Sequence, residues 1–363
     1  MTTLGALRST TSDLPLIAHT FTADPSAHVF DGKLYIYPSH DRETNTVNSI
    51  HGGRYDMNDY HVFSLESING PVIDHGVALR LDDIPWASKQ LWAPDAATKN
   101  GKYYFYFPAR DKEVIFRIGV GTSHIPQGPF TAEPEPIAGS YSIDPASFID
   151  EDGRAYLYFG GIQGGQLQCW SSGKFDGNAS IKSANTSALM PRVARLSEDM
   201  LSFSSDALPL AILDVNDQPL QADDHDRRFF EGAWMHKYNG LYYFSYSTGD
   251  THFIVYATGR SPLGPFKYRG RILEPVVGWT THHSIVKFKG RWGTGFHQVE
   301  NTECFSSKDC GFRYDFVSTK LEQATRTLVS DVRFETFVSQ FLLMTFKDLQ
   351  GRGLRSSDSE GFW

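Results

Sequence analysis

Features that mark several protein classes are scarce in this sequence. It holds three cysteines in 363 residues, at positions 169, 304 and 310, and none has the C-x-x-C spacing of a zinc or thiol redox site. No stretch approaches the roughly 18 consecutive apolar residues of a membrane span. We therefore expect incidental or buried thiols and no membrane partner.

Positive charge is also in short supply. The chain has 34 basic against 42 acidic side chains, a formal charge of −8, and no run of lysine or arginine. Contact with a phosphate backbone needs such a basic surface, so no nucleic-acid partner is expected. The first 16 residues lack the apolar core of a signal peptide. The chain as written is expected in the cytoplasm, or outside the cell if a leader has been removed.

Aromatic residues, in contrast, make up 14% of the chain, and many lie in five segments that share one pattern. In each segment, a tight turn joins two runs rich in aromatic and branched residues. Asp-Gly or Asn-Gly forms this turn four times, and Lys-Gly forms it in a fifth, weaker copy. Such pairs favour two-residue β-hairpins, because both turn residues must take a positive φ. The turns begin at Asp31, Asn100, Asp152, Asn239 and Lys289.

The spacing of these turns predicts the architecture. Successive turns are 50 to 87 residues apart, which suits four-stranded propeller blades of about 40–50 residues with insertions. The sequence therefore predicts an all-β fold, a five-bladed β-propeller, over residues 16–320. Residues 1–15 are interpreted as an N-terminal tail. The segment 321–363 has no assigned structure beyond a helical pattern at 337–350.

A short polar motif stands just before each turn, and three of these motifs begin with a carboxylate residue. Asp24 and Asp144 begin Asp-Pro motifs, and Glu231 begins Glu-Gly-Ala-Trp. Each motif alone could be a turn starter, since Asp binds nearby backbone groups and Pro fixes φ. In a propeller, however, equivalent positions of the innermost strands meet at one mouth of the central channel. Carboxylates flanking a glycosidic bond are what its hydrolysis needs.

On these motifs the chain resembles the five-bladed propeller glycoside hydrolases of family 43, which include β-xylosidases, α-L-arabinofuranosidases and arabinanases. The resemblance covers residues 16–292. It rests on TADPSAHVFDGKLYIYPSHD, LWAPDA, SIDPASFID, FFEGAWMHKYNGLYYFSYS and TTHHSIVKFKG in combination. The first of these segments is most similar to the β-xylosidase and arabinofuranosidase branch.

This resemblance implies a role for each carboxylate. Asp24 would be the general base, Asp144 would orient the general acid and raise its pKa, and Glu231 would be that acid. Hydrolysis would invert the anomeric carbon in a single displacement. The implied partners are xylo-oligosaccharides or arabinose-containing oligosaccharides, from which single pentoses would be released.

Other site residues follow from the same resemblance. The channel histidine of the family falls on His282 rather than His283, and His282 is a candidate water-mediated ligand of a structural Ca²⁺, although no cofactor is expected to be required. Trp92 and Trp86 are candidate sugar platforms, with core packing as the alternative for both. Arg313 takes the place of the sugar-binding arginine.

Two alternatives to this function remain open at the level of the sequence. A carbohydrate-binding propeller that has lost catalysis would have the same fold. A retaining fructosidase is the enzymatic alternative. Keeping all three carboxylates argues against the binding module, because binding alone does not need a protonated acid.

Overall fold

A computed structural model describes residues 16–17, 19–42, 44, 52–53, 55–67, 70–181, 184–273, 282–299 and 312–317. Side chains are described for all of these except residues 291, 293–299 and 312–317. The described residues belong to one compact unit, Met1–Glu322. The predicted tail at 1–15 and the segment 321–363 lie outside them.

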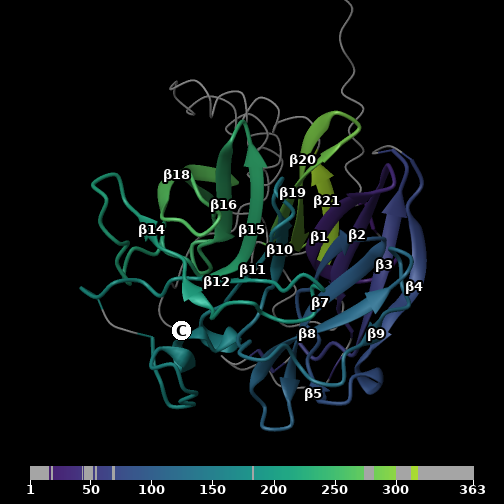
Figure 1. Cartoon of the computed structure of the whole chain (residues 1–363), viewed down its shortest axis with the longest axis horizontal. Helices are drawn as coiled ribbons and strands as arrows, with labels where there is room; N and C mark the ends of the chain where they lie inside the picture. Colours follow the sequence, from purple (N-terminus) through teal and green to yellow (C-terminus); the bar gives the residue numbers. More distant parts are fainter. Residues whose placement is uncertain are drawn as a thin grey trace, which may run out of the picture. The chain divides into compact units, whose positions relative to one another are not determined.

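β-Strands dominate this part of the chain (Figure 1). The first sheet has the order β1-β2-β3-β4. The second has the order β5-β7-β8-β9, with β6 also paired to β7. The bounds of these strands are β1 (Thr22–Phe30), β2 (Lys33–His40), β3 (Asp59–Leu65), β4 (Ile73–Arg80), β5 (Ala87–Lys89), β6 (Asp95–Lys99), β7 (Lys102–Asp111), β8 (Phe116–Ser123) and β9 (Thr131–Ala132).

Three further sheets have the orders β10-β11-β12-β13, β14-β18-β17-β16-β15 and β19-β20-β21. Their strands are β10 (Ala146–Ile149), β11 (Ala155–Phe159), β12 (Arg192–Arg195), β13 (Leu208–Pro209), β14 (Ile212–Leu213), β15 (Glu231–Tyr238), β16 (Leu241–Ser247), β17 (Ile254–Gly259), β18 (Phe266–Leu273), β19 (His283–Phe288), β20 (Arg291–Val299) and β21 (Phe312–Val317). The helices among the described residues are short 3-10 turns, η1 (Leu81–Asp83), η2 (Gln163–Gly165) and η3 (Leu167–Trp170).

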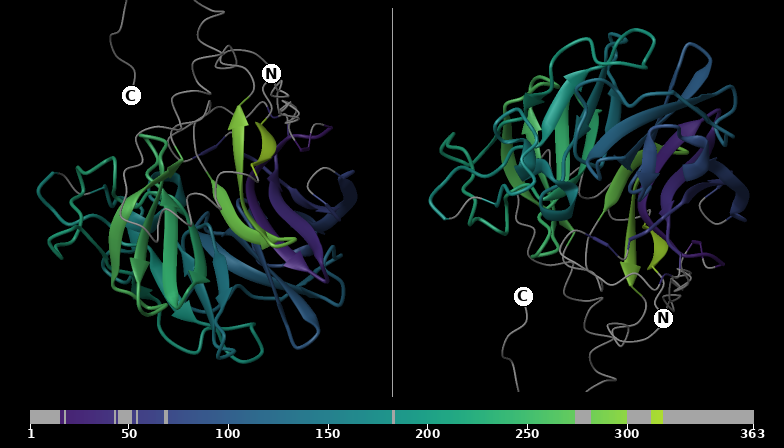
Figure 2. Two further views of the ribbon diagram at one scale, coloured as in Figure 1. Left: turned by 90° about the horizontal axis from the view of Figure 1, so that it is seen from above. Right: turned by 90° about the horizontal axis from the view of Figure 1, so that it is seen from below.

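One strand of each sheet contributes to a closed ring. β1 contacts β6, β6 contacts β10, β10 contacts β15, β15 contacts β19, and β19 contacts β1 again. Figure 2 shows the sheets arranged around this centre. Sheets that radiate from a ring of inner strands form a β-propeller. The predicted all-β class and propeller architecture are confirmed.

Four of the five predicted hairpin turns have the expected backbone. In each of them both turn residues have a positive φ, for example 49° and 76° at Asp31 and Gly32, and 48° and 81° at Lys289 and Gly290. Lys289 adopts this conformation without being Asn or Asp. The weaker Lys-Gly copy therefore forms the same turn as the others.

The turn predicted at Asp152-Gly153 is wrong as a two-residue hairpin. The last ladder pair is Ile149 and Ala155, but the backbone N–H of Asp150 still donates to the Arg154 carbonyl at 2.9 Å, so the hairpin loop inside this pair is 151–153. The side chain of Asp150 accepts hydrogen bonds from Lys237 Nζ at 2.8 Å and from the Tyr242 hydroxyl at 2.5 Å. These side-chain contacts join the turn to the next sheet, while the N–H of Gly153, which has a φ of 82°, donates to the Asp150 carbonyl and closes the turn.

Aromatic side chains fill the space between neighbouring sheets. Tyr37 of the first sheet packs on Phe105 of the second, with ring centroids 5.9 Å apart. Tyr158 and Phe244 make the corresponding contact between the third and fourth sheets, also at 5.9 Å. Each fully buried ring of this kind stabilises the fold by about 2–3 kcal/mol through apolar burial. The aromatic richness of the sequence is thus explained by its core.

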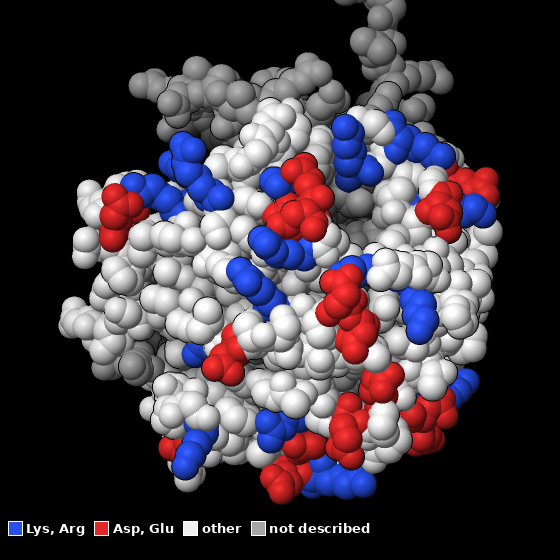
Figure 3. All heavy atoms as spheres, viewed as in Figure 1, with Lys and Arg blue, Asp and Glu red and all other residues white. Residues whose placement is uncertain are grey.

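The surface in Figure 3 carries acidic and basic side chains interspersed, rather than one extended basic patch. Among the described residues, no helix has the length and apolar character that crossing a membrane requires.

Candidate active site

The three predicted carboxylates lie where inner strands begin. Asp24 is the third residue of β1, Asp144 stands two residues before β10, and Glu231 opens β15. At each point the backbone departs from regular strand geometry, with φ of 51° at Asp24, 56° at Asp144 and 68° at Gly232. The ladders of β1 and β15 also shift register here. Such irregularities re-aim side chains and are concentrated at functional sites.

His282 joins two of these carboxylates. Its Nδ1 lies 3.0 Å from Oδ1 of Asp24, and its Nε2 lies 3.1 Å from Oδ2 of Asp144. Burial alone would lower the pKa of His282, but the charges of Asp144 and Asp24 outweigh burial and raise it well above its usual value. A protonated imidazole therefore bridges the two aspartates across β1 and the start of β10.

Glu231 is tied into the same cluster through its neighbour. The backbone N–H of Gly232 donates to Oδ2 of Asp144 at 3.0 Å. A Cβ on Gly232 would lie 3.4 Å from the His282 ring, so this glycine packs directly on the bridging imidazole. Four residues from sequence-distant motifs thus form one site.

The Glu231 carboxyl is suited to donate a proton. Burial raises its pKa to about 8, and the charge of Asp144 adds to this effect, whereas His282 opposes it. A carboxyl group with this pKa is mostly protonated at neutral pH, as a general acid must be before it acts.

Asp24 has a different environment. Its Oδ2 accepts a hydrogen bond from the Ser39 hydroxyl at 2.7 Å, and its Oδ1 faces His282. Ser39 lies on β2, opposite Ala23 in the ladder. A carboxylate fixed by one hydroxyl and one imidazolium keeps a defined orientation, which a general base needs.

Trp92 is connected to the carboxylate cluster through Tyr60. Its backbone carbonyl accepts a hydrogen bond from the Tyr60 hydroxyl at 2.6 Å, and the pKa of Tyr60 is raised well above its usual value by burial and, secondarily, by the charges of Asp24 and Asp144. The half-buried Trp92 ring packs against Phe116 at 4.6 Å. The Trp92 backbone is therefore linked to the site through Tyr60, and its ring packs on Phe116.

The other predicted site residues differ in their surroundings. Trp86 is only 7% exposed and stacks parallel to Phe107 within the core, so its observed role is packing, and sugar contact by Trp86 stays a prediction. His283 binds the Ser245 hydroxyl at 2.7 Å, away from the carboxylate bridge. Arg313 lies in β21, but its side chain is outside the described residues.

Sequence reasoning did not assign a role to Asp95. This residue of β6 is 1% exposed. Its carboxylate accepts hydrogen bonds from Ser26 of β1 and from Ser147 of β10. The available signal was its place in LWAPDA, which stands at the same repeat position as the three carboxylate motifs.

Comparisons with known proteins identify the family. The family model described as glycosyl hydrolases family 43 matches residues 13–313. The chain is 64% identical to xylosidase/arabinosidase 43A of Humicola insolens over 295 residues, covering 79% of this chain and 90% of that protein. It is 49% identical to a β-xylosidase of Xylanibacter ruminicola, covering 80% of this chain and 89% of that protein.

Solved structures give the same result. A β-xylosidase/α-arabinofuranosidase from a compost microbial metagenome, determined with xylotriose in a calcium-free form, shares 57% identity and a TM-score of 0.81, covering 84% of this chain and 93% of that one. A family 43 enzyme of Xanthomonas citri complexed with xylotriose shares 50% identity and a TM-score of 0.77, covering 84% and 89%. The resemblance seen in the sequence and the predicted glycosidase activity are confirmed. The chain belongs to glycosyl hydrolases family 43.

Proposed function

We propose that this glycoside hydrolase releases terminal xylose from xylo-oligosaccharides, as a β-1,4-xylosidase, with side activity on α-L-arabinofuranosides. The observation that carries this proposal is the buried Glu231, whose pKa is raised to about 8, together with two aspartates that share one histidine. Relatives named xylosidase/arabinosidase and structures with bound xylotriose support the substrate class.

The reaction is a single displacement at the anomeric carbon. Asp24 removes a proton from a water molecule, whose oxygen attacks the anomeric carbon. Glu231 gives its proton to the departing glycosidic oxygen, and the configuration inverts. Asp144 keeps Glu231 protonated through its negative charge and fixes the Gly232 backbone next to it.

Sugar binding would involve an aromatic surface. Trp92, supported by Phe116, would cover the apolar side of the terminal ring. Arg313 would bind sugar hydroxyls from β21, and Trp86 would contribute to the wall behind Trp92. These three roles and the exo mode of action are parts of the proposal.

The scaffold for this chemistry is proposed to be a propeller of five blades over residues 16–320. The closed contacts among β1, β6, β10, β15 and β19 support this number. The sheet β19-β20-β21 would be the fifth blade.

Calcium is proposed to have at most a structural role. Both ring nitrogens of His282 face carboxylate oxygens, and the raised pKa of this ring leaves it without a free lone pair for a cation. Ca²⁺ also prefers oxygen ligands. The described geometry therefore does not favour His282 as a direct ligand of Ca²⁺. His282 would contact the ion through a water molecule. Chelator treatment should lower kcat less than twofold, and complete loss of turnover in a protein that stays folded would contradict this.

The decisive test compares initial rates on three substrates. Aryl β-D-xyloside should be cleaved fastest, aryl α-L-arabinofuranoside more slowly, and linear arabinan least. Xylotriose should yield single xylose units of inverted configuration in proton NMR at early times. Retained configuration would favour the fructosidase-like alternative, and binding of xylotriose without turnover would favour the binding module.

A further inference from the structure

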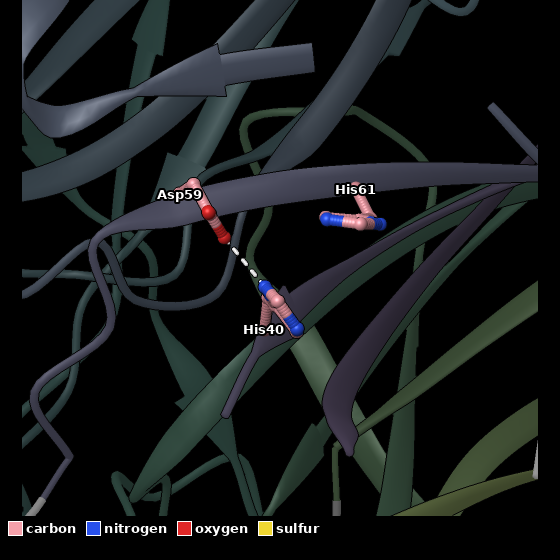
Figure 4. Close-up of side chains that lie close together, drawn as sticks. All are labelled: His40, Asp59 and His61. Atoms are coloured by element: carbon pink, nitrogen blue, oxygen red, sulfur yellow. Dashed lines mark hydrogen bonds and ion pairs between the residues drawn. The ribbon is translucent and has the colours of Figure 1, made fainter. Parts of the chain in front are cut away.

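A cluster of two histidines and one aspartate lies on the first sheet, outside the catalytic cluster. His40 ends β2, and Asp59 and His61 lie on β3. One nitrogen or oxygen from each of them lies within 4.8 Å of the others. Figure 4 shows the Asp59 carboxylate directed at His40, with a ring nitrogen of His61 turned toward the pair. All three side chains are partly exposed, so an ion from solution can reach them.

The second nitrogen of each imidazole is already held by an oxygen. His40 Nε2 lies 3.0 Å from the Thr20 hydroxyl, and Nδ1 donates to Oδ1 of Asp59 at 2.5 Å, so an ion bound by both groups would take the place of the Nδ1 proton. His61 Nδ1 lies 3.1 Å from Oδ1 of Asp74, so Nε2 is the nitrogen of His61 that would bind the ion. In metal sites, an outer oxygen of this kind fixes the tautomer and orientation of a histidine ligand.

We propose that His40, Asp59 and His61 bind a divalent transition ion of the zinc type. Two imidazoles and one carboxylate suit such an ion better than calcium or magnesium. An adjoining cavity of about 310 Å³, lined in part by His40 and Asp59, leaves room for a water as the fourth ligand. Arg80 lies 3.8 Å from the other Asp59 oxygen and weakens binding by its charge, so we expect a dissociation constant in the micromolar range.

The test titrates the full chain with Co²⁺ and follows both heat and the visible spectrum. One Co²⁺ per chain should bind with a tetrahedral absorption band, and Zn²⁺ should displace it while excess Ca²⁺ should not. His61→Gln should weaken binding at least tenfold, and Asp74→Asn about tenfold through the lost outer contact. His75→Gln is the matched control, because His75 lies on the same sheet and binds Ser64 instead. Unchanged affinity in folded His61→Gln, or equal weakening in His75→Gln, would overturn the proposal.

A second, independent observation concerns Asp95. One carboxylate oxygen binds the Ser26 hydroxyl and, at 2.6 Å, His28 Nε2. The other binds the backbone N–H and the hydroxyl of Ser147, both at 2.5 Å. Ser26 follows Asp24 by two residues, and Ser147 follows Asp144 by three.

We infer that Asp95 is a positioning residue that fixes both Asp-Pro motifs relative to each other. This inference rests on the proposed roles of Asp24 and Asp144. Because Asp95 contacts neither carboxylate directly through these bonds, it acts through the short segments that carry them. Loss of the bond to Ser26 would change the position of Asp24, the base. Loss of the bonds to Ser147 would change the position of Asp144, whose charge raises the pKa of Glu231.

The experiment measures pH profiles of kcat/KM for three variants. Ser26→Ala should shift the acidic limb, which reports Asp24, and Ser147→Ala should shift the basic limb, which reports Glu231. Asp95→Asn should shift both and lower kcat at least tenfold with KM changed less than twofold. Loss of thermal stability with both limbs unmoved would show that Asp95 is only structural. Absence of pentoside hydrolysis in the unaltered chain would instead refute the proposed function itself.

Discussion

At the scale of single residues, the site separates two carboxyl groups by their surroundings. Glu231 is buried, and its pKa is raised to about 8 by burial and then by Asp144. Asp24 is held by a hydroxyl and an imidazolium. One group can therefore donate a proton while the other accepts one, which is the division of labour that glycoside hydrolysis requires.

Leaving-group dependence tests this division. Glu231→Gln and Asp24→Asn should each reduce kcat on xylobiose about 10³-fold, since each removes one half of the proton transfer. Dinitrophenol leaves without protonation, so dinitrophenyl xyloside should restore activity to Glu231→Gln at least tenfold more than to Asp24→Asn. Steady-state rates on both substrates provide the measurement, and equal restoration would mean that the two roles are wrongly assigned.

The basic limb of the pH profile tests the raised pKa. Activity needs protonated Glu231, so kcat/KM should fall as the pH rises through about 8. Asp144→Asn removes the second cause of the raised pKa, and the limb should move toward lower pH. A limb that stays in place in this variant would show that burial alone sets the pKa.

At the scale of elements, the inner strands hold the site through positive-φ backbone. The region beside Glu231 is especially close-packed. A Cβ on Gly249, which has a φ of 75°, would lie 2.2 Å from Cγ of Phe230, the residue before Glu231. Gly240 has a similar φ of 72°, but a Cβ there would meet nothing within 4 Å. The two glycines therefore share a backbone requirement and differ in the space beside them.

Alanine at these two glycines isolates the effect of packing. Gly240→Ala should cost about 1 kcal/mol of unfolding free energy from its positive φ. Gly249→Ala should cost about 2–4 kcal/mol, because Phe230 must also move, and it should lower kcat through the displaced Glu231. Urea unfolding and kcat measurements on both variants check this. Equal losses would indicate that the φ requirement dominates and that Phe230 adjusts freely.

At the scale of the whole molecule, two neutral histidines, the buried His283 and the partly buried His236, make stability depend on pH. Burial lowers the pKa of His236 to about 3, and burial likewise lowers the pKa of His283 to about 3. Each contributes stability that is fully present above its unfolded pKa of about 6.5 and is lost as the pH falls toward 3. The loss reaches at most about 3 kcal/mol for each residue at pH 4.

Replacing one of these histidines should protect the fold in acid. His236→Phe keeps a ring stacked on Tyr243, where the centroids lie 5.0 Å apart, and removes the site that must take up a proton. The fall in Tm between pH 6.5 and 4 should be smaller in this variant than in the unaltered chain. His124→Gln, at an exposed position, serves as the control. An identical acid-side fall in His236→Phe would rule His236 out as a cause.

The repeated hairpins and the carboxylates of the site could be predicted from the amino-acid sequence. Turn chemistry and strand alternation act over a few residues, so Asp31-Gly32 and Lys289-Gly290 could be interpreted locally. The repeat pattern predicts the site carboxylates, because equivalent motifs begin with Asp24, Asp144 and Glu231. In the closed ring, Asp24 and Asp144 lie on either side of His282.

The side-chain contacts between sheets could not be predicted from the sequence. Three features depend on residues far apart in the chain. They are the bridge through His282, the hydrogen bonds of Asp95 to two strands, and the packing of Trp86 on Phe107. Such contacts carry no local signal, because hydrogen bonds and packing between blades form only when the ring of inner strands closes.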